Sequence, residues 1–242
     1  MIMSKRRTKI IFKKVRDANL KYKMINHGDH LPVGLSGGKD SFTMLYFLHL
    51  VKKYTPLDFK IFPVYIDLGW ENDLNPLVDF CNSLGMTLFI EKTGIAEVVF
   101  EHRQEKNPCS LCSHLRRGAL NRVAKGLSCN KVALGHHLDD VVITLLMSII
   151  YEGRFNVFKP VTYLDRMDIT IIRPLVYVEE VDIRLFADSL NIVPVKNPCP
   201  VDGLTKRDQL QPLLEFIEKQ YPGAKRKFLS SIENANSQSF WL

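Results

Sequence analysis

The chain has 242 residues, enough for one large domain with a sizeable buried core or for a domain with a small appendage. Its residues are 46% hydrophobic and 24% charged, which excludes a disordered or fibrous protein and is typical of a globular one. A net charge of +7 favours a polyanionic partner such as nucleic acid.

Neither a secretory signal nor a membrane span is expected from the sequence. The first 16 residues are rich in Lys and Arg and hold no apolar stretch of the kind that a signal peptide needs. The longest mostly apolar run, residues 141–151, is too short to cross a bilayer. We therefore expect a cytoplasmic protein, in which five cysteines do not indicate a disulfide framework.

Helices and strands alternate along the predicted chain. Apolar periodicity predicts a helix over residues 10–24, a strand over 31–35, a helix over 41–53, a strand over 59–66, a helix over 76–84 and a strand over 87–90. It then predicts a helix over 113–125, a strand over 131–134, a helix over 138–150, a strand over 169–172 and a helix over 178–191. Two further helices are expected in the tail, on either side of Pro222-Gly223.

This alternation predicts an α/β fold, a parallel sheet with helices on both faces. The expected organisation is a basic helical segment over residues 1–30, the sheet domain over 31–200 and a helical extension over 201–242 packed on that domain. In the extension, the basic side chains are expected to be exposed; they are Lys206, Arg207, Lys225, Arg226 and Lys227.

The first predicted strand is followed at once by a glycine-rich segment that opens a helix. Its residues are Leu35, Ser36, Gly37, Gly38, Lys39, Asp40 and Ser41. Glycines let backbone N–H groups approach phosphate oxygens, and the helix amino terminus and the lysine add positive charge. The segment is not a Walker A loop, because Val33 stands at the first glycine position and Asp40 at the Ser or Thr position. It predicts a nucleotide-binding loop of another kind.

A second candidate motif follows the predicted strand at 131–134 and also opens a helix. Its residues are Gly135, His136, His137, Leu138, Asp139 and Asp140. Carboxylates at a helix start are often simple caps. The position after a strand favours a ligand site instead, because ligands bind beyond the carboxyl ends of parallel strands.

Three cysteines share a local pattern. Cys109 and Cys112 form a CxxC pair after Asn-Pro, and Cys199 follows a second Asn-Pro much later in the chain. The spacing alone supports three alternatives equally: a zinc site completed by a histidine or another cysteine, a thiol–disulfide pair, or a 4Fe-4S cluster with three protein ligands.

Together these motifs resemble the PP-loop ATP pyrophosphatases, and more narrowly their tRNA 2-thiocytidine synthetase branch. The resemblance runs over residues 10–234. It rests on Ser-Gly-Gly-Lys-Asp-Ser, Cys-Ser-Leu-Cys with Leu-Arg-Arg-Gly, Gly-His-His-x-Asp-Asp, Tyr151-x-Gly153-Arg154, Ile172-Arg173-Pro174-Leu175 and Asn-Pro-Cys-Pro.

The resemblance implies an enzyme that uses ATP and Mg²⁺ to adenylate the C2 oxygen of a tRNA pyrimidine, with cytidine at position 32 expected. Sulfur carried by a 4Fe-4S cluster then replaces that oxygen. The implied cluster ligands are Cys109, Cys112 and Cys199, and the implied catalytic residues are Asp40, Arg116 and Asp139. The implied ATP contacts are Leu35, Ser36, Gly37, Gly38, Lys39, Asp40, Ser41, Ile66, Gly135, His136 and Asp140.

The implied partners are tRNA, a sulfur donor such as a cysteine desulfurase, and a second copy of the chain in a homodimer. Two other functions stay open: thiolation of another RNA base or of a small molecule, and a zinc-stabilised RNA-binding protein without catalysis. The second leaves Asp40 and the glycine-rich loop unexplained. Basic residues at 5–16 and 206–227 fit tRNA phosphates or solvated faces equally well.

Overall fold

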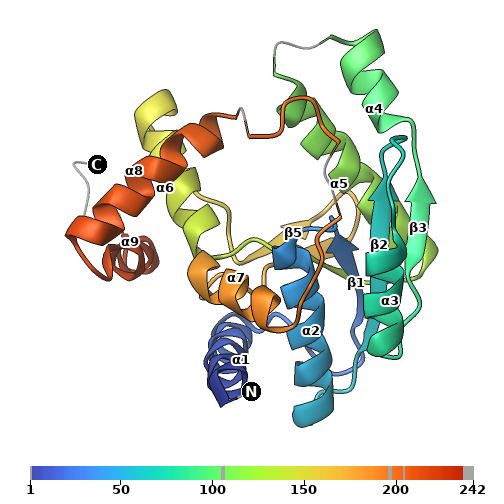
Figure 1. Ribbon diagram of the computed structural model, residues 1–242, viewed down its shortest axis with the longest axis horizontal. Coiled ribbons are helices and arrows are strands. Elements are labelled where there is room, and N and C mark those ends of the chain that lie inside the picture. Colours follow the sequence, from blue (N-terminus) through green and yellow to red (C-terminus); the bar gives the residue numbers. More distant parts are fainter. Residues whose placement is uncertain (1, 105–106, 196–197, 204, 237–242) are drawn as a thin grey trace.

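The computed structural model describes residues 2–104, 107–195, 198–203 and 205–236 (Figure 1). The strands are β1 (His30–Leu35), β2 (Lys60–Asp67), β3 (Phe89–Lys92), β4 (Lys131–Ala133), β5 (Val161–Leu164) and β6 (Ile169–Ile172). The helices are α1 (Ile2–Tyr22), α2 (Lys39–Tyr54), α3 (Asn75–Ser83), α4 (Ile95–Glu97), η1 (Val98–His102), α5 (Pro108–Gly126), α6 (Leu138–Glu152), α7 (Glu180–Ser189), α8 (Lys206–Gln220) and α9 (Ala224–Glu233).

In the described part of the chain, the strands form one sheet in the order β3-β2-β1-β4-β6-β5. The first five of these pair in parallel, which confirms the predicted parallel sheet for most of its width. The order reverses between β1 and β4: the chain moves from β1 outward to β2 and β3, and then returns to the other side of β1. This reversal places a crevice beyond the carboxyl ends of β1 and β4.

The edge strand β5, which was not predicted from the sequence, is antiparallel to β6. The chain reverses through a tight turn in which the Met167 N–H donates to the Leu164 carbonyl at 3.1 Å. A turn this short can join only antiparallel neighbours, since a parallel pair needs a long crossover.

Both faces of the sheet are covered by helices, as predicted (Figure 1). Alternate strand residues point to opposite faces. Tyr65 therefore packs with the core formed by α1, α2 and α7, whereas its neighbours Val64 and Ile66 pack with the core beneath α5. The buried helix α2 directly follows β1, and the buried helix α5 directly precedes β4. Each helix fixes the position of a loop at the carboxyl edge of the sheet.

Several boundaries differ from those predicted. Helix α5 begins at Pro108, five residues before the expected start, because proline is favoured in the first turn of a helix. Helix α1 starts at Ile2 instead of residue 10; Lys5, Arg6 and Lys9 in this added part are exposed, and it has no apolar periodicity to reveal it. The helical residues 95–102 were not expected, and β3 lies two residues later than predicted.

The two C-terminal helices pack against α6. Leu210 and Leu214 of α8 share a small buried cluster with Leu138, Val142 and Ile143 of α6. The predicted tail beyond residue 236 lies outside the described residues. None of the helices in the described ranges combines the length and the apolar character that crossing a bilayer requires.

Candidate active site

The glycine-rich loop turns sharply between β1 and α2. Gly37 has a positive φ of +83°, and a Cβ added to it would lie 2.7 Å from the Cβ of Val195. The serines of the loop close it internally: Ser41 Oγ donates to the Gly38 carbonyl at 2.8 Å, and the Ser36 N–H donates to Ser41 Oγ at 3.3 Å. The loop is thereby held in a compact form at the amino terminus of α2, where anions bind favourably.

Lys39 and Asp40 occupy the first turn of α2. Lys39 Nζ lies 2.9 Å from Glu180 Oε1 and 3.4 Å from Asp40 Oδ1. Burial lowers the pKa of Lys39, but the Asp40 and Glu180 carboxylates outweigh burial and leave that pKa raised. The lysine is therefore a fixed positive charge beside the loop.

Asp40 carries an unsatisfied oxygen. Its Oδ1 atom is buried and has no hydrogen-bond partner among the residues that the structure describes. Burial raises the pKa of Asp40 by more than His137 and Lys39 lower it. A buried carboxylate oxygen without a partner is costly, and a cation bound there would satisfy it.

The second motif lies directly against the glycine-rich loop. A Cβ added to Gly135 would lie 3.5 Å from the backbone nitrogen of Ser41, so the two backbones approach closely. His137 Nε2 lies 3.8 Å from Asp40 Oδ1, and the His137 N–H donates to Asp140 Oδ2 at 3.0 Å. The two motifs therefore meet at the crevice between β1 and β4, as their positions after these strands predict.

The two aspartates of the second motif are each paired with a cation from the C-terminal helices. Asp139 is 1% exposed, pairs with Lys225 of α9 and accepts a hydrogen bond from the Glu180 N–H at 2.8 Å. Asp140 pairs with Arg207 of α8. Burial raises the pKa of Asp140, but His137 and Arg207 lower it by more, so this carboxylate is held in its charged form.

These pairs correct the expectation that the basic side chains of the tail are exposed. Lys225 is buried and Arg207 is partly buried, because each pairs with a buried or partly buried carboxylate. These carboxylates lie 86 and 67 residues earlier in the chain. A local pattern cannot show such distant partners. Lys206, Arg226 and Lys227 are exposed, as predicted.

His136 is enclosed by neighbouring side chains. The centre of its ring lies 4.9 Å from the centre of the Phe158 ring. The Arg173 guanidinium also lies 4.9 Å from the centre of the Phe158 ring. Burial lowers the pKa of His136 to about 4, despite the opposing effect of Asp140. The imidazole is therefore neutral near pH 7, able to donate and accept hydrogen bonds without adding charge.

A cavity of about 290 Å³ opens beside the glycine-rich loop. Its lining includes the predicted site residues Ser36, Gly38, Ile66 and Arg116. The lining is completed by Pro198 of the second Asn-Pro-Cys sequence and by five residues that the sequence did not single out: Tyr65, Leu68, Trp70, Asn72 and Val195. Tyr65 and Trp70 lie at and just beyond the carboxyl end of β2, a position that could have identified them.

Cys109 and Cys112 lie in the first turns of α5. They are three positions apart, so they lie on the same side of the helix. Burial raises the pKa of Cys109 and of Cys112, and a charge on Cys199 raises each pKa further. The Arg116 guanidinium acts in the opposite direction on Cys112. The three cysteines, which come from α5 and the segment before α8, therefore lie near enough to interact electrostatically.

All five cysteines lie in the described residues, and none of them forms a disulfide. Among the residues that the structure describes, no group of three or more His, Cys, Asp or Glu side chains is placed so that it could hold a metal ion. Asn197, which precedes Pro198 in the second Asn-Pro-Cys sequence, lies outside the described residues. Cys81 and Cys129 are each buried in one of the two cores.

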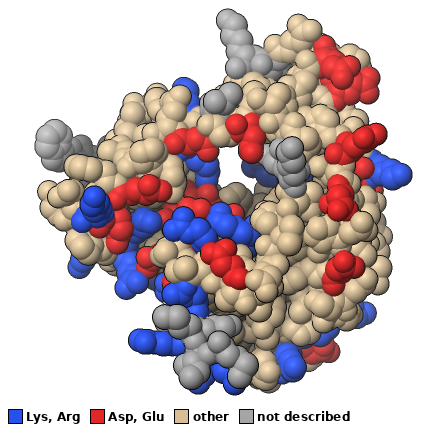
Figure 2. Space-filling view, viewed as in Figure 1, with Lys and Arg blue, Asp and Glu red and all other residues tan. Residues whose placement is uncertain are grey.

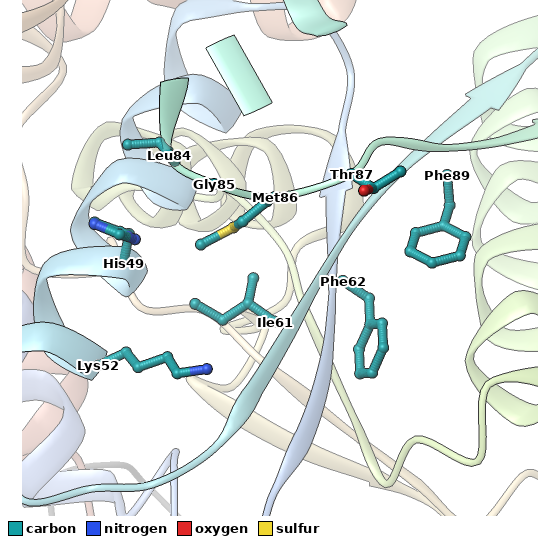
Figure 3. Close-up of a pocket in the computed structure, with 9 residues that line it drawn as sticks. All are labelled: His49, Lys52, Ile61, Phe62, Leu84, Gly85, Met86, Thr87 and Phe89. Carbon is teal, nitrogen blue, oxygen red and sulfur yellow. The ribbon is translucent and has the colours of Figure 1, made fainter. Parts of the chain in front are cut away.

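The face that carries these motifs is open. Figure 2 shows an opening in the middle of the molecule, between the side formed by α6 and α8 and the side formed by α5, with Lys and Arg gathered along one rim. A second cavity, of about 400 Å³, lies at the amino ends of β2 and β3. Figure 3 shows His49 and Lys52 of α2 on one side of it and Phe62 and Phe89 on the other. It contains none of the predicted site residues.

Comparison with known proteins agrees with this arrangement. A family model described as a PP-loop domain matches residues 6–211. The chain is 36% identical over 234 residues to the tRNA-cytidine(32) 2-sulfurtransferase of Pelobacter propionicus, with 93% of this chain and 87% of that protein covered. It is 35% identical over 233 residues to the protein of the same name from Geobacter sulfurreducens, with 93% and 91% covered.

Among solved structures, the fold is similar to that of the U34-tRNA thiolase NcsA from Methanococcus maripaludis with its 4Fe-4S cluster. The TM-score is 0.77 at 27% sequence identity, and the match covers 96% of this chain and 81% of that one.

Proposed function

The chain belongs to the PP-loop family, in the group of the tRNA-cytidine(32) 2-sulfurtransferases, and from this membership we propose that it is an ATP-dependent tRNA sulfurtransferase. We propose further that its target is the C2 position of cytidine 32. The named relatives for that base are 34–36% identical to this chain, closer than the 27% of the uridine 34 thiolase.

One observation carries the proposal. The cavity beside the glycine-rich loop is lined by Ser36 and Gly38 of that loop together with Arg116 and Pro198. Arg116 follows the CxxC pair on α5, and Pro198 is adjacent to Cys199. A nucleotide bound at the loop and a group bound by the thiols would therefore both face this cavity.

The first half of the reaction activates the base. A carbonyl oxygen is a poor leaving group, so the C2 oxygen attacks the α-phosphorus of ATP, pyrophosphate leaves, and the oxygen becomes part of an adenylate. The loop N–H groups, Lys39 and Arg116 offset the charge that builds on the phosphates. Mg²⁺ would bind the unsatisfied Asp40 oxygen and polarise the same phosphates.

The second half replaces oxygen with sulfur at C2, and AMP leaves with the original oxygen. Cys109, Cys112 and Cys199 would hold a 4Fe-4S cluster, and that cluster would supply the sulfur. The chemistry of the donor set supports this proposal, since thiolates are the ligands of iron–sulfur clusters and Cys109 and Cys112 lie on one turn of α5. Burial raises the pKa of Cys112 and Arg116 partly offsets that rise, which eases formation of the thiolate, the form that binds metal.

The second motif positions these groups. Asp139 holds the Glu180 N–H, and Glu180 in turn holds Lys39 beside the loop. We therefore propose that Asp139 acts through its neighbours, while Asp40 and Arg116 face the substrates. His136, neutral near pH 7, is available to hydrogen-bond a bound nucleotide.

The test combines composition with a product. The protein is purified without oxygen and assayed for iron and sulfide, and tRNA from cells lacking it is analysed for 2-thiocytidine. We expect iron and sulfide in the wild-type protein, their loss in Cys199→Ser, and their retention in the control Cys129→Ser, whose thiol is buried in the core. Thiolation should also require ATP, a cysteine desulfurase and cysteine.

Zinc without iron after anaerobic reconstitution would contradict the cluster. Unchanged 2-thiocytidine in the tRNA of cells lacking the protein would contradict the assigned base.

A further inference from the structure

The end of α6 and the segment after it expose aromatic and basic side chains in alternation. Tyr151 is 44% exposed and Phe155 is 45% exposed, while Arg154 and Lys159 are exposed between and after them. Glu152 is the acidic residue within this stretch. Exposed rings interleaved with cations are typical of surfaces that stack nucleic acid bases and bind phosphates.

The C-terminal extension adds a cation to the same surface. Lys206, the first residue of α8, places its Nζ 4.5 Å from the centre of the Tyr151 ring. One face of the tyrosine is thereby covered by a lysine that is itself exposed. The contact joins α6 to α8.

This surface continues into the candidate active site. Phe158, three residues beyond Phe155, contacts both the Arg173 guanidinium and the His136 ring, each 4.9 Å from the centre of its ring. His136 belongs to the motif that lies against the glycine-rich loop. Planar groups therefore extend from the exposed end of α6 to the site itself.

Resting on the proposed function, we propose that this α6 surface, formed by Tyr151, Arg154, Phe155, Lys159 and Lys206, binds the single-stranded RNA beside the target base. A flanking nucleotide stacks on an exposed ring, and the three cations neutralise phosphates of the strand. RNA fits better than a protein partner, because exposed rings and cations together match the bases and the phosphates of a nucleic acid strand. Sequence-specific recognition of RNA commonly uses such unpaired, stacked bases.

The chain offers a matched control for the key pair. Lys53 lies over the ring of Tyr54 with its Nζ 5.5 Å from the ring centre, and Tyr54 is 66% exposed. That pair lies at the carboxyl end of α2, beside the amino end of the sheet. The candidate site lies at the other end of α2. It has the same chemistry as the α6 pair without the same location.

The test measures binding of tRNA isolated from cells lacking the protein and labelled at its 3′ end with a fluorophore. We expect Tyr151→Ala to weaken binding about ten-fold or more, the order lost with one base–aromatic stack, and Tyr151→Phe to bind nearly as tightly as the wild type. Lys206→Ala should reduce the slope of log K against log salt by about 0.7 if one phosphate contact is lost. Tyr54→Ala and Lys53→Ala should match the wild type.

The outcomes separate this surface from the function on which it depends. Wild-type binding and thiolation with an unaffected Tyr151→Ala would overturn the surface alone. Unchanged tRNA binding combined with slower sulfur uptake from a desulfurase would assign the surface to a protein donor and overturn the RNA assignment. A wild-type protein that neither binds nor thiolates tRNA would overturn the proposed function itself.

Discussion

Replacing Lys225 with Met tests whether the C-terminal helices support the active site. The ammonium of Lys225 pairs with Asp139, and the two side chains are 11% and 1% exposed. Lys225→Met keeps most of the side-chain volume but leaves a buried carboxylate without its counter-charge. Breaking a buried ion pair in this way costs about 3–5 kcal/mol of the free energy of unfolding.

The lower end of that range is expected here, because Asp139 keeps the hydrogen bond from the Glu180 N–H at 2.8 Å. A loss of about 3 kcal/mol lowers the unfolding temperature of a chain of this size by about 6–12 °C. Adding Asp139→Asn should recover most of the loss, because the amide removes the buried charge and can still accept that hydrogen bond.

The assay is thermal unfolding, together with pyrophosphate release measured well below every unfolding temperature. Lys131→Met is the matched control: Lys131 pairs with Asp29 at 2.7 Å, and both side chains are buried at the opposite edge of the sheet. We expect both variants to lose stability and only Lys225→Met to lose activity, since Glu180 links Asp139 to Lys39. Wild-type stability of Lys225→Met, or a double variant no more stable than the single one, would refute the reasoning.

Three further outcomes are expected. Asp40→Asn should slow pyrophosphate release by at least about 100-fold, because an amide is a poor ligand for Mg²⁺; a normal rate would remove Asp40 from the mechanism. Gly37→Ala should weaken ATP binding in a direct assay, since its Cβ would lie 2.7 Å from Val195, whereas Gly85→Ala, with a positive φ but nothing within 4 Å, should bind ATP normally. Burial depresses the pKa of His136 from 6.5 to about 4, so the unfolded chain takes up the proton first and the free energy of unfolding falls as pH drops below about 6.5. That loss is about 2 kcal/mol between pH 7 and pH 5 in urea titrations and should be absent in His136→Asn; equal losses in both proteins would contradict the burial of the imidazole.

The meeting of the two loop motifs could be predicted from the sequence. Each motif follows an apolar run that forms a strand, and the carboxyl ends of neighbouring parallel strands lie together. The close approach of Gly135 to Ser41 is the direct result. The alternation of strands and helices likewise predicted the sheet, because its periodicity is local.

The features that the sequence did not reveal depend on distant partners. The cations that pair with Asp139 and Asp140 come from helices whose own pattern shows only a basic surface. Strand β5 has only four residues and is a strand because it pairs antiparallel with β6. A local sequence pattern does not determine that pairing. Trp70, which lines the cavity beside the glycine-rich loop, lies in a segment without regular secondary structure. Apolar periodicity gives no signal there.

The contact between Val195 and Gly37 joins two parts of the chain that the reaction uses at different moments. The Val195 N–H donates to the Gly37 carbonyl at 2.9 Å, and its side chain fills the space that the glycine leaves. Four residues later the chain reaches Cys199, a span of at most about 14 Å. Because Val195 is fixed against Gly37, this length of chain limits how far Cys199 can lie from a nucleotide bound at the loop.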